Sequence, residues 1–132
     1  MSIEIVEDWS AYSPYFGRDE FACSHTGSCR MQSHFMRKLL DIRMDYGKPM
    51  VISSGFRDPS HPIEAKKERS GEHTFGTAVD VAVQGVDAMR LLQVALAHGI
   101  SRVGVKQDNK GTEYLHLGVG GPGLPNPALW SY

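Results

Sequence analysis

The sequence predicts an α+β fold, with helices packed on a small, largely antiparallel sheet. Two segments, 33–46 and 87–98, carry apolar residues at helical spacing, and four short segments have the composition or alternation of strands. Helices and strands follow one another in mixed order, which favours this class. The 132 residues, 41% hydrophobic and 22% charged, fit one globular domain over residues 1–132.

The two predicted helices have recognisable ends. The first is expected to start at Ser33, whose hydroxyl can cap it, and to end at Gly47. The second is expected to start at its cap, Asp87, and to be closed by Gly99. The inward stripe of the first helix consists of Phe35, Met36, Leu39, Leu40 and Ile42, and that of the second of Leu91, Leu92, Ala95 and Leu96.

The predicted strands cover residues 50–53, 78–83, 102–106 and 113–119. In the second of them the three valines share one face, while Asp80 shares the other face with two alanines. The valines should therefore lie in the core and the carboxylate on an uncrowded face. The polar segment 63–72 is predicted to be an exposed loop, and the tail 120–132 a loop with a terminal aromatic anchor.

Charge and hydropathy exclude several classes of function. The net charge of −1 and pI near 6.6 give no electrostatic case for binding nucleic acid or an anionic membrane. No apolar run approaches the roughly 20 residues that span a bilayer. The first ten residues, "MSIEIVEDWS", lack the basic and apolar regions of a secretory signal. We expect a monomer that is made in the cytoplasm.

Cys23 and Cys29, in "CSHTGSC", are too few for a disulfide framework. They can be two ordinary thiols or one local bridge, or they can bind a metal together with His25. A structural zinc here lacks an evident fourth ligand. A small zinc-finger adaptor nevertheless stays open as one hypothesis.

A second group of candidate metal ligands comprises His73, Asp80 and His116. Catalytic zinc takes three protein ligands, usually with nitrogen and oxygen donors, and leaves a fourth position for water. Histidines in strands are more often hydrogen-bonded structural residues, and an Asp after a turn is usually a cap or an ion-pair partner. Spacing alone leaves these alternatives open.

Three ordered blocks, "SSGFR", "EHTFGTAVDV" and "EYLHL", resemble the zinc D-alanyl-D-alanine carboxypeptidases and the bacteriophage L-alanyl-D-glutamate endolysins. The resemblance covers roughly residues 20–132. The family pattern is a Ser-Gly-aromatic-Arg turn, then His-x-x-Gly-x-Ala-x-Asp, then Glu-x-x-His. These enzymes share the hedgehog/DD-peptidase fold with lysostaphin-type peptidases and the hedgehog signalling domain, so the resemblance implies that fold.

The resemblance implies one Zn²⁺ per chain, held by His73, Asp80 and His116. It further implies Glu113 as the general base and Arg57 as the group that stabilises charge on the substrate carbonyl. Without the resemblance, Arg57 would be taken for a surface turn residue. On a regular strand Glu113 and His116 would face opposite sides, so Glu113 must lie at a bend or at the strand start.

Further residues have weaker claims on the site. His61 and Ser70 are candidate substrate-binding residues, and Glu72, beside His73, is an alternative base. The chain also departs from the family pattern at two positions. Gly118 stands where the family has an acidic residue two positions after the last His, so the partner of that His must come from elsewhere. Gly71 stands where a serine is common, with Ser70 one place earlier.

The expected function is a zinc peptidase that hydrolyses peptidoglycan stem peptides or cross-links, of the D,D-carboxypeptidase or L-Ala-D-Glu endopeptidase type. The resemblance implies an endolysin-like role in cell-wall lysis, with release from the host cytoplasm through a holin pore. The loops 56–72 and 118–129 should determine which bond is cut. The alternative is an inactive module that holds zinc and binds the wall or a partner, as in the hedgehog domain.

Overall fold

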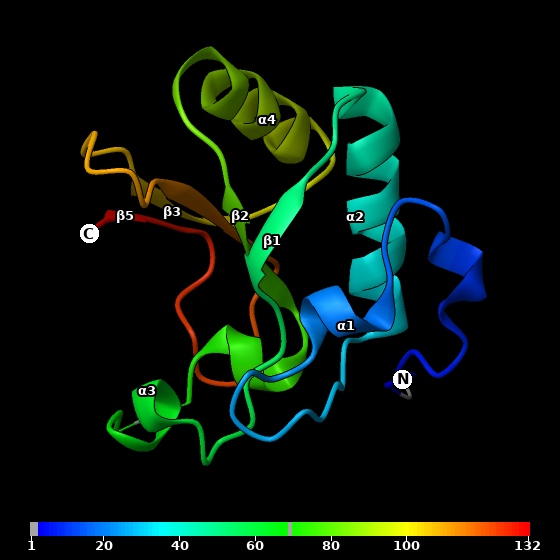
Figure 1. The fold of residues 1–132 in the computed structure, drawn as a ribbon. Coiled ribbons are helices and arrows are strands. Elements are labelled where there is room, and N and C mark those ends of the chain that lie inside the picture. The colour runs from blue at the N-terminus through cyan, green and yellow to red at the C-terminus, as the bar shows by residue number, and fades with distance from the viewer. Residues whose placement is uncertain (1–2, 69) are drawn as a thin grey trace.

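The computed structural model describes residues 3–68 and 70–132 and contains one five-stranded sheet (Figure 1). Its strands are β1 (Val51–Ser54), β2 (Ala78–Ala82), β3 (Arg102–Lys106), β4 (Tyr114–Gly118) and β5 (Ala128–Ser131). They lie in the order β1-β2-β4-β3-β5. All neighbours are antiparallel except β3 and β5, which are parallel. The prediction of an α+β fold with a largely antiparallel sheet is confirmed.

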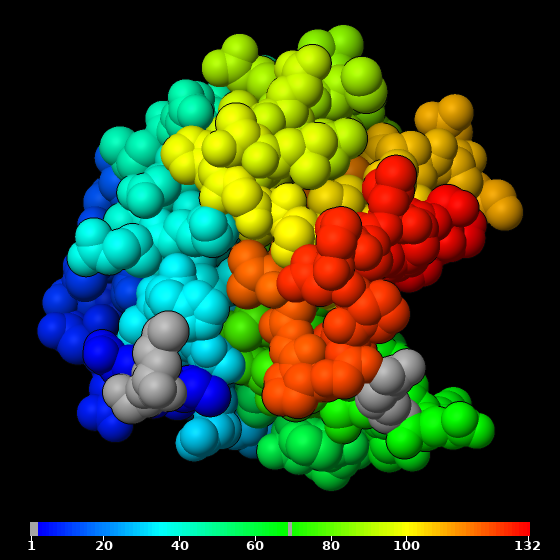
Figure 2. All heavy atoms as spheres, turned by 180° about the vertical axis from the view of Figure 1, so that it is seen from behind, coloured from blue at the N-terminus to red at the C-terminus, as the bar shows by residue number. Residues whose placement is uncertain are grey.

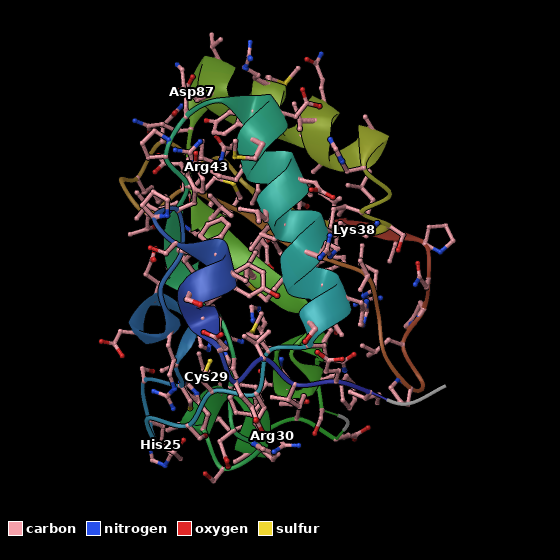
Figure 3. The ribbon with its side chains drawn as sticks, turned by 90° about the vertical axis from the view of Figure 1, so that its right-hand side faces the viewer. His25, Cys29, Arg30, Lys38, Arg43 and Asp87 are labelled. Carbon is pink, nitrogen blue, oxygen red and sulfur yellow. The ribbon has the colours of Figure 1, made fainter. Side chains whose placement is uncertain are left out.

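Two long helices, α2 (Ser33–Tyr46) and α4 (Gly85–Ala97), pack on one face of the sheet. In Figure 3, α2 faces the viewer and the strands lie behind it. The short helices are α1 (Arg18–Phe21), α3 (Pro62–Ala65) and the 3₁₀ turns η1 (Trp9–Tyr12) and η2 (Glu72–Phe75). Among residues 3–68 and 70–132, no helix has the length and apolar character needed to cross a bilayer.

The first long helix has the predicted bounds, but its cap differs from the prediction. Gly47 ends the helix in the left-handed region at φ 76°, where a side chain would be strained. The N-cap residue is Gln32, whose side chain makes no capping hydrogen bond. Ser33 is already helical and its hydroxyl donates to Glu4. The predicted serine cap was therefore wrong, because the chain turns into the helix one residue earlier.

The second long helix begins before its predicted cap. Asp87 lies inside the first turn, where its carboxylate accepts a hydrogen bond from Lys48 at 2.8 Å. Leu91 and Ala95 are fully buried, as predicted, but Leu96 is 53% exposed. Leu96 follows Ala95 by about 100° around the helix, and this rotation carries it off the buried stripe.

One face of the sheet packs into the core, and the other carries candidate metal ligands. Val79 and Val81 of β2 are buried in the core beneath the helices, as their alternation predicted. On the opposite face, the antiparallel register of β2 and β4 places Asp80 directly across from His116. The sheet therefore brings two candidate ligands together from positions 36 residues apart in sequence.

Two segments that were predicted to be loops contain secondary structure. Residues 63–72 are not a simple exposed loop, because they contain most of α3 and the start of η2, and Glu64 and Glu72 are buried. The tail is not all loop either, since it supplies β5, which pairs with β3. Polarity indicated exposure in the first case, but both carboxylates are buried with hydrogen-bond partners.

Candidate metal centre

The face of the sheet opposite the long helices carries a cavity of about 410 Å³. Strands β2, β3 and β4 and the turn η2 form part of its wall. The segment around α3 and the C-terminal residues Trp130 and Tyr132 form the rest. Figure 2 shows the molecule hollowed between the red C-terminal segment and the green segment around α3. The polar residues that line it include Arg57, His73, Asp80, Arg102 and His116.

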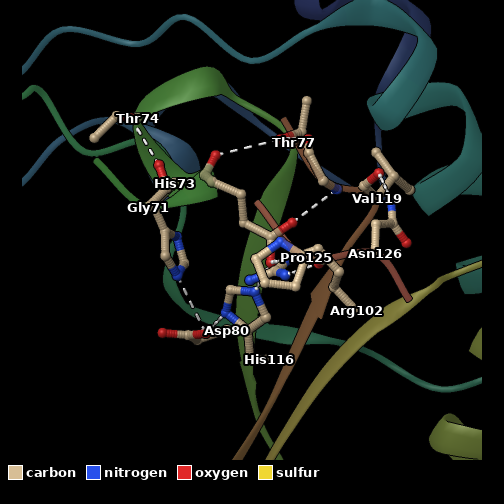
Figure 4. Close-up of polar contacts among 12 residues, drawn as sticks. Gly71, His73, Thr74, Thr77, Asp80, Arg102, His116, Val119, Pro125 and Asn126 are labelled. Atoms are coloured by element: carbon tan, nitrogen blue, oxygen red, sulfur yellow. Dashed lines mark hydrogen bonds and ion pairs between the residues drawn. The ribbon is translucent and has the colours of Figure 1, made fainter. Parts of the chain in front are cut away.

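His73, Asp80 and His116 form a buried cluster at this cavity. Each offers one ligand atom, and these atoms lie within 4.8 Å of one another. Asp80 Oδ1 is 3.4 Å from His73 Nε2 and 3.0 Å from His116 Nδ1. Ligands about 2.0–2.1 Å from a tetrahedral zinc lie roughly 3.3 Å apart. Figure 4 shows both rings directed at the Asp80 carboxylate. The spacing fits one zinc ion.

The second nitrogen of each ring is bound on its outer side. His73 Nδ1 donates to the carbonyl oxygen of Gly55 at 2.8 Å. His116 Nε2 donates to a carboxylate oxygen of Glu72. Each bond holds the ring so that its other nitrogen is directed at Asp80, where it can bind a metal once it has lost its proton, and metal-ligating histidines are oriented in this way. This pattern is a second, independent sign of a metal site.

Charge around the cluster also suits a cation. Burial alone would raise the pKa of Asp80, but the contacts with His116 and His73 outweigh it and hold the pKa well below its usual range. Burial alone would lower the pKa of His116, but Asp80 and Glu72 raise it above the usual value. Asp80 is therefore ionised, which is the form a metal binds.

The turn that carries Arg57 is packed against His73. Gly55 is required here, because an added Cβ would lie 2.6 Å from the Phe21 backbone. The Arg57 guanidinium donates to Ser54 Oγ at 3.2 Å and to Asp80 Oδ2 at 3.5 Å. It also forms an ion pair of 3.0 Å with buried Glu64. The structure thus places Arg57 beside the cluster and fixes it there, instead of leaving it on a surface turn.

Glu113 immediately precedes β4, so the expectation that it lies at a strand start is confirmed. Its side chain is buried and accepts a hydrogen bond from the Gly111 amide at 3.2 Å. It lines a neighbouring cavity of about 410 Å³, which shares Arg57, Asp80 and Tyr114 with the cavity of the cluster. Glu113 itself does not line the cavity of the cluster; the neighbouring cavity connects it to Arg57 and Asp80.

The two candidate substrate-binding residues do not line the cavity at the cluster. His61 is the N-cap of α3, where Nδ1 accepts a hydrogen bond from the Ile63 amide, and its Nε2 is 3.3 Å from Ser24 Oγ. Ser70 is half-buried and precedes Gly71, which does line the cavity. His61 therefore caps the N-terminus of α3. Its position directly before Pro62, a residue favoured at the first position of a helix, could have indicated this role.

Sequence reasoning missed the aromatic wall of the cavity. Trp130 and Tyr132, at the end of the chain, line it together with Tyr114. The Trp130 ring lies 5.0 Å from the His116 ring and 5.0 Å from the Arg102 guanidinium. Gly104 makes room for it, since an added Cβ would lie 2.5 Å from the indole nitrogen. In the sequence, only the aromatic residues at the end of the tail pointed to this wall.

The zinc-finger hypothesis gains no support. Cys23 and Cys29 are both free thiols, and neither belongs to the metal cluster found among the described residues. Figure 3 places His25 and Cys29 in the segment between α1 and α2. The Cys23 sulfur accepts a hydrogen bond from the Asp58 amide at 3.3 Å, so it is engaged within the fold.

Comparison with known proteins gives one family. Residues 14–117 match the sequence model of the family described as Peptidase M15, which is well over half of the chain. The matched range contains the three clustered residues together with Arg57 and Glu113. No curated protein matches the chain.

Proposed function

This chain belongs to the Peptidase M15 family, and from that premise we propose that it is a zinc peptidase of peptidoglycan stem peptides or cross-links. One observation carries the zinc-dependent part of the proposal. His73, Asp80 and His116 form a buried donor set at zinc spacing, and an outer hydrogen bond turns each histidine toward the common point.

His73, Asp80 and His116 would hold the zinc, which when bound would supply an acidified water and polarise the scissile carbonyl. Glu113 is assigned to accept the proton of the attacking water and to pass it to the leaving amine. Arg57 stays charged at every working pH and is assigned to stabilise the charge that develops on the carbonyl oxygen. Its bonds to Ser54 and Glu64 hold the guanidinium in place before substrate binds, which is what such stabilisation needs.

The cavity supports a peptide that carries carboxylates. Three basic residues line it, each paired with a buried carboxylate, and one of them, Lys67, has a side chain that is 40% exposed. A murein stem peptide has free carboxylates and little bulk, so it suits a small cavity with cationic and aromatic walls. We also propose that the chain works as a monomer, without nucleic acid or membrane insertion, and reaches the wall after release from the host cytoplasm, as an endolysin does.

Peptide release from purified murein tests the proposal. Zinc-loaded protein should release soluble peptides, identified by mass spectrometry, and the new amino or carboxyl ends should identify the bond that was cut. A chelator should abolish release, and added zinc should restore it. Release that survives complete removal of zinc would overturn the peptidase assignment.

The alternative is a module of the same fold that holds zinc without cleaving. The position of Glu113, buried next to the cavity of Arg57 and Asp80, favours the enzyme, because a structural zinc site needs no carboxylate there. Zinc-bound protein that releases nothing from any murein would favour the module.

A further inference from the structure

Glu72 has an unusual position relative to the two histidines. It adjoins His73 in sequence, yet its carboxylate contacts the other ligand histidine, His116. The side chain is 1% exposed. The same carboxylate accepts hydrogen bonds from Arg102 Nε at 3.0 Å and from the Gly120 amide at 2.9 Å. Arg102 and the Gly120 amide thus hold this carboxylate against His116.

Gly118 provides the space for this carboxylate. It lies on the same face of β4 as His116, two residues further on, and a Cβ added there would overlap the carboxylate of Glu72. The backbone of Gly118 is not in the left-handed region, so its conformation does not require glycine. What requires glycine at 118 is the volume that the Glu72 side chain occupies.

We infer that Glu72 is the positioning residue of His116, and that Glu72 and Gly118 form an exchangeable pair. In this pair the carboxylate reaches His116 from η2, through space that a side chain at 118 would otherwise fill. This inference rests on the zinc-binding part of the proposed function. It also removes Glu72 from the candidate bases, because its carboxylate is buried among three fixed donors.

The two ligand histidines are consequently held by different acceptors. His73 donates to a neutral carbonyl, whereas His116 donates to an ionised carboxylate. A carboxylate partner fixes the tautomer and makes the imidazole a more basic ligand, and loss of such a partner typically weakens metal binding by roughly 10–100-fold. Glu72 should therefore influence zinc affinity without touching the ion.

The exchange can be tested with four variants. Glu72→Gln, which keeps the size of the side chain, should bind zinc about tenfold more weakly, and Glu72→Ala up to about 100-fold more weakly, in competition with a chromophoric chelator. The double variant Glu72→Ala/Gly118→Asp should recover most of the affinity, because the new carboxylate occupies the vacated space. Gly118→Asp alone should lose thermal stability, since two carboxylates would compete for one volume. The matched control, Glu20→Gln, alters a glutamate that accepts a hydrogen bond from the Gly17 amide at the start of α1 and does not line the cavity, so it should keep zinc affinity.

A readout on the apoprotein separates this inference from the proposed function. Nitrogen-15 NMR of the His116 ring should show a hydrogen-bonded proton on Nε2 in the wild-type chain, and this proton should be lost to rapid exchange with water in Glu72→Ala. If the Ala variant does not fold, Glu72→Gln carries the test. Zinc affinity unchanged in Glu72→Gln, or no rescue by the double variant, would overturn the inference alone. A wild-type chain that binds no zinc would overturn the proposed function, and the absence of a proton on Nε2 of His116 in that chain would overturn the inference as well.

Discussion

The cavity has a floor, formed by Asp80 and His116, and a rim, formed by Arg57 and the segment around Glu64. Different interactions hold these two regions in place. Asp80 and His116 stand on paired strands, so the ladder of backbone hydrogen bonds fixes their separation. Arg57 stands on an irregular segment that is held by side chains around Glu64. The Glu64 carboxylate accepts from Arg57 and Lys67 at 3.0 Å each and from the Gly71 amide, also at 3.0 Å.

This difference separates two kinds of mutational effect. A change of a floor residue removes a ligand while the backbone ladder persists, so the chemistry should be lost before the fold. A change at the rim removes part of a buried ion-pair network, so positioning and stability should fall together. Substitutions in the two regions should therefore differ in whether they lower the stability of the fold together with the activity.

The largest effect is expected at the ligand histidines, His116 on the floor and His73 on η2. His73→Ala and His116→Ala should each lose most of the zinc and all measurable murein cleavage, because two ligands cannot hold a tight site. Metal analysis after gel filtration measures the zinc. His98→Ala is the matched control: its ring binds Asp45 away from the cavity, and the variant should keep one zinc per chain. Full occupancy in either cavity variant would show that the ligand set is wrong.

Glu113→Gln should reduce murein cleavage by roughly 10²- to 10⁴-fold, the usual contribution of a general base. Zinc should remain near one per chain, because Glu113 lines the adjacent cavity and is outside the metal cluster. Single-turnover assays on defined murein fragments measure the loss. Zinc that disappears with Glu113 would make it a ligand, and unchanged cleavage would mean that another group is the base.

Arg57→Lys should reduce turnover by roughly 10–100-fold, a smaller loss than that of the base. Lysine keeps the charge, but it cannot donate to Ser54, Glu64 and Asp80 from one planar fork. Circular dichroism should show a folded chain with a lowered melting temperature, and metal analysis should match the wild type. A variant that unfolds instead would identify Arg57 as a structural residue of the turn, and its catalytic assignment would be withdrawn.

The smallest effect is a pH-dependent loss of stability at the rim. Burial alone would raise the pKa of Glu64, but Lys67, the Gly71 amide and Arg57 outweigh it and lower the pKa to about 2. A lowered folded-state pKa stabilises the fold above the unfolded pKa, near 4.5, and this stabilisation is lost as the pH falls toward about 2.

Glu64→Gln should therefore lower the free energy of unfolding by about 1–3 kcal/mol at neutral pH. The gap to the wild type should close as the pH falls from about 4.5 to about 2. Urea titrations across this range measure it, with exposed Glu68→Gln as the control. A gap that stays constant down to the lowest pH would contradict the charged network.

The same comparison explains what the sequence could predict. The alternation in 78–83 and the spacing in 33–46 directly report which side chains share a face, so the core and the position of Asp80 followed from them. No such period marks residues 63–72, where polarity indicated exposure although Glu64 and Glu72 are buried among cations and amides. The contact of Glu72 with His116 depends on Gly118, 46 residues away, and only the folded chain brings that space and that side chain together.

Anomalous diffraction at the zinc edge, from crystals of the zinc-loaded wild-type chain, shows directly whether His73, Asp80 and His116 bind the zinc. One anomalous peak per chain is expected, about 2.0–2.2 Å from His73 Nε2, a carboxylate oxygen of Asp80 and His116 Nδ1. A peak between Cys23 and Cys29, a peak bound by Glu113 in place of His116, or zinc-loaded crystals without a peak at the cluster would contradict it.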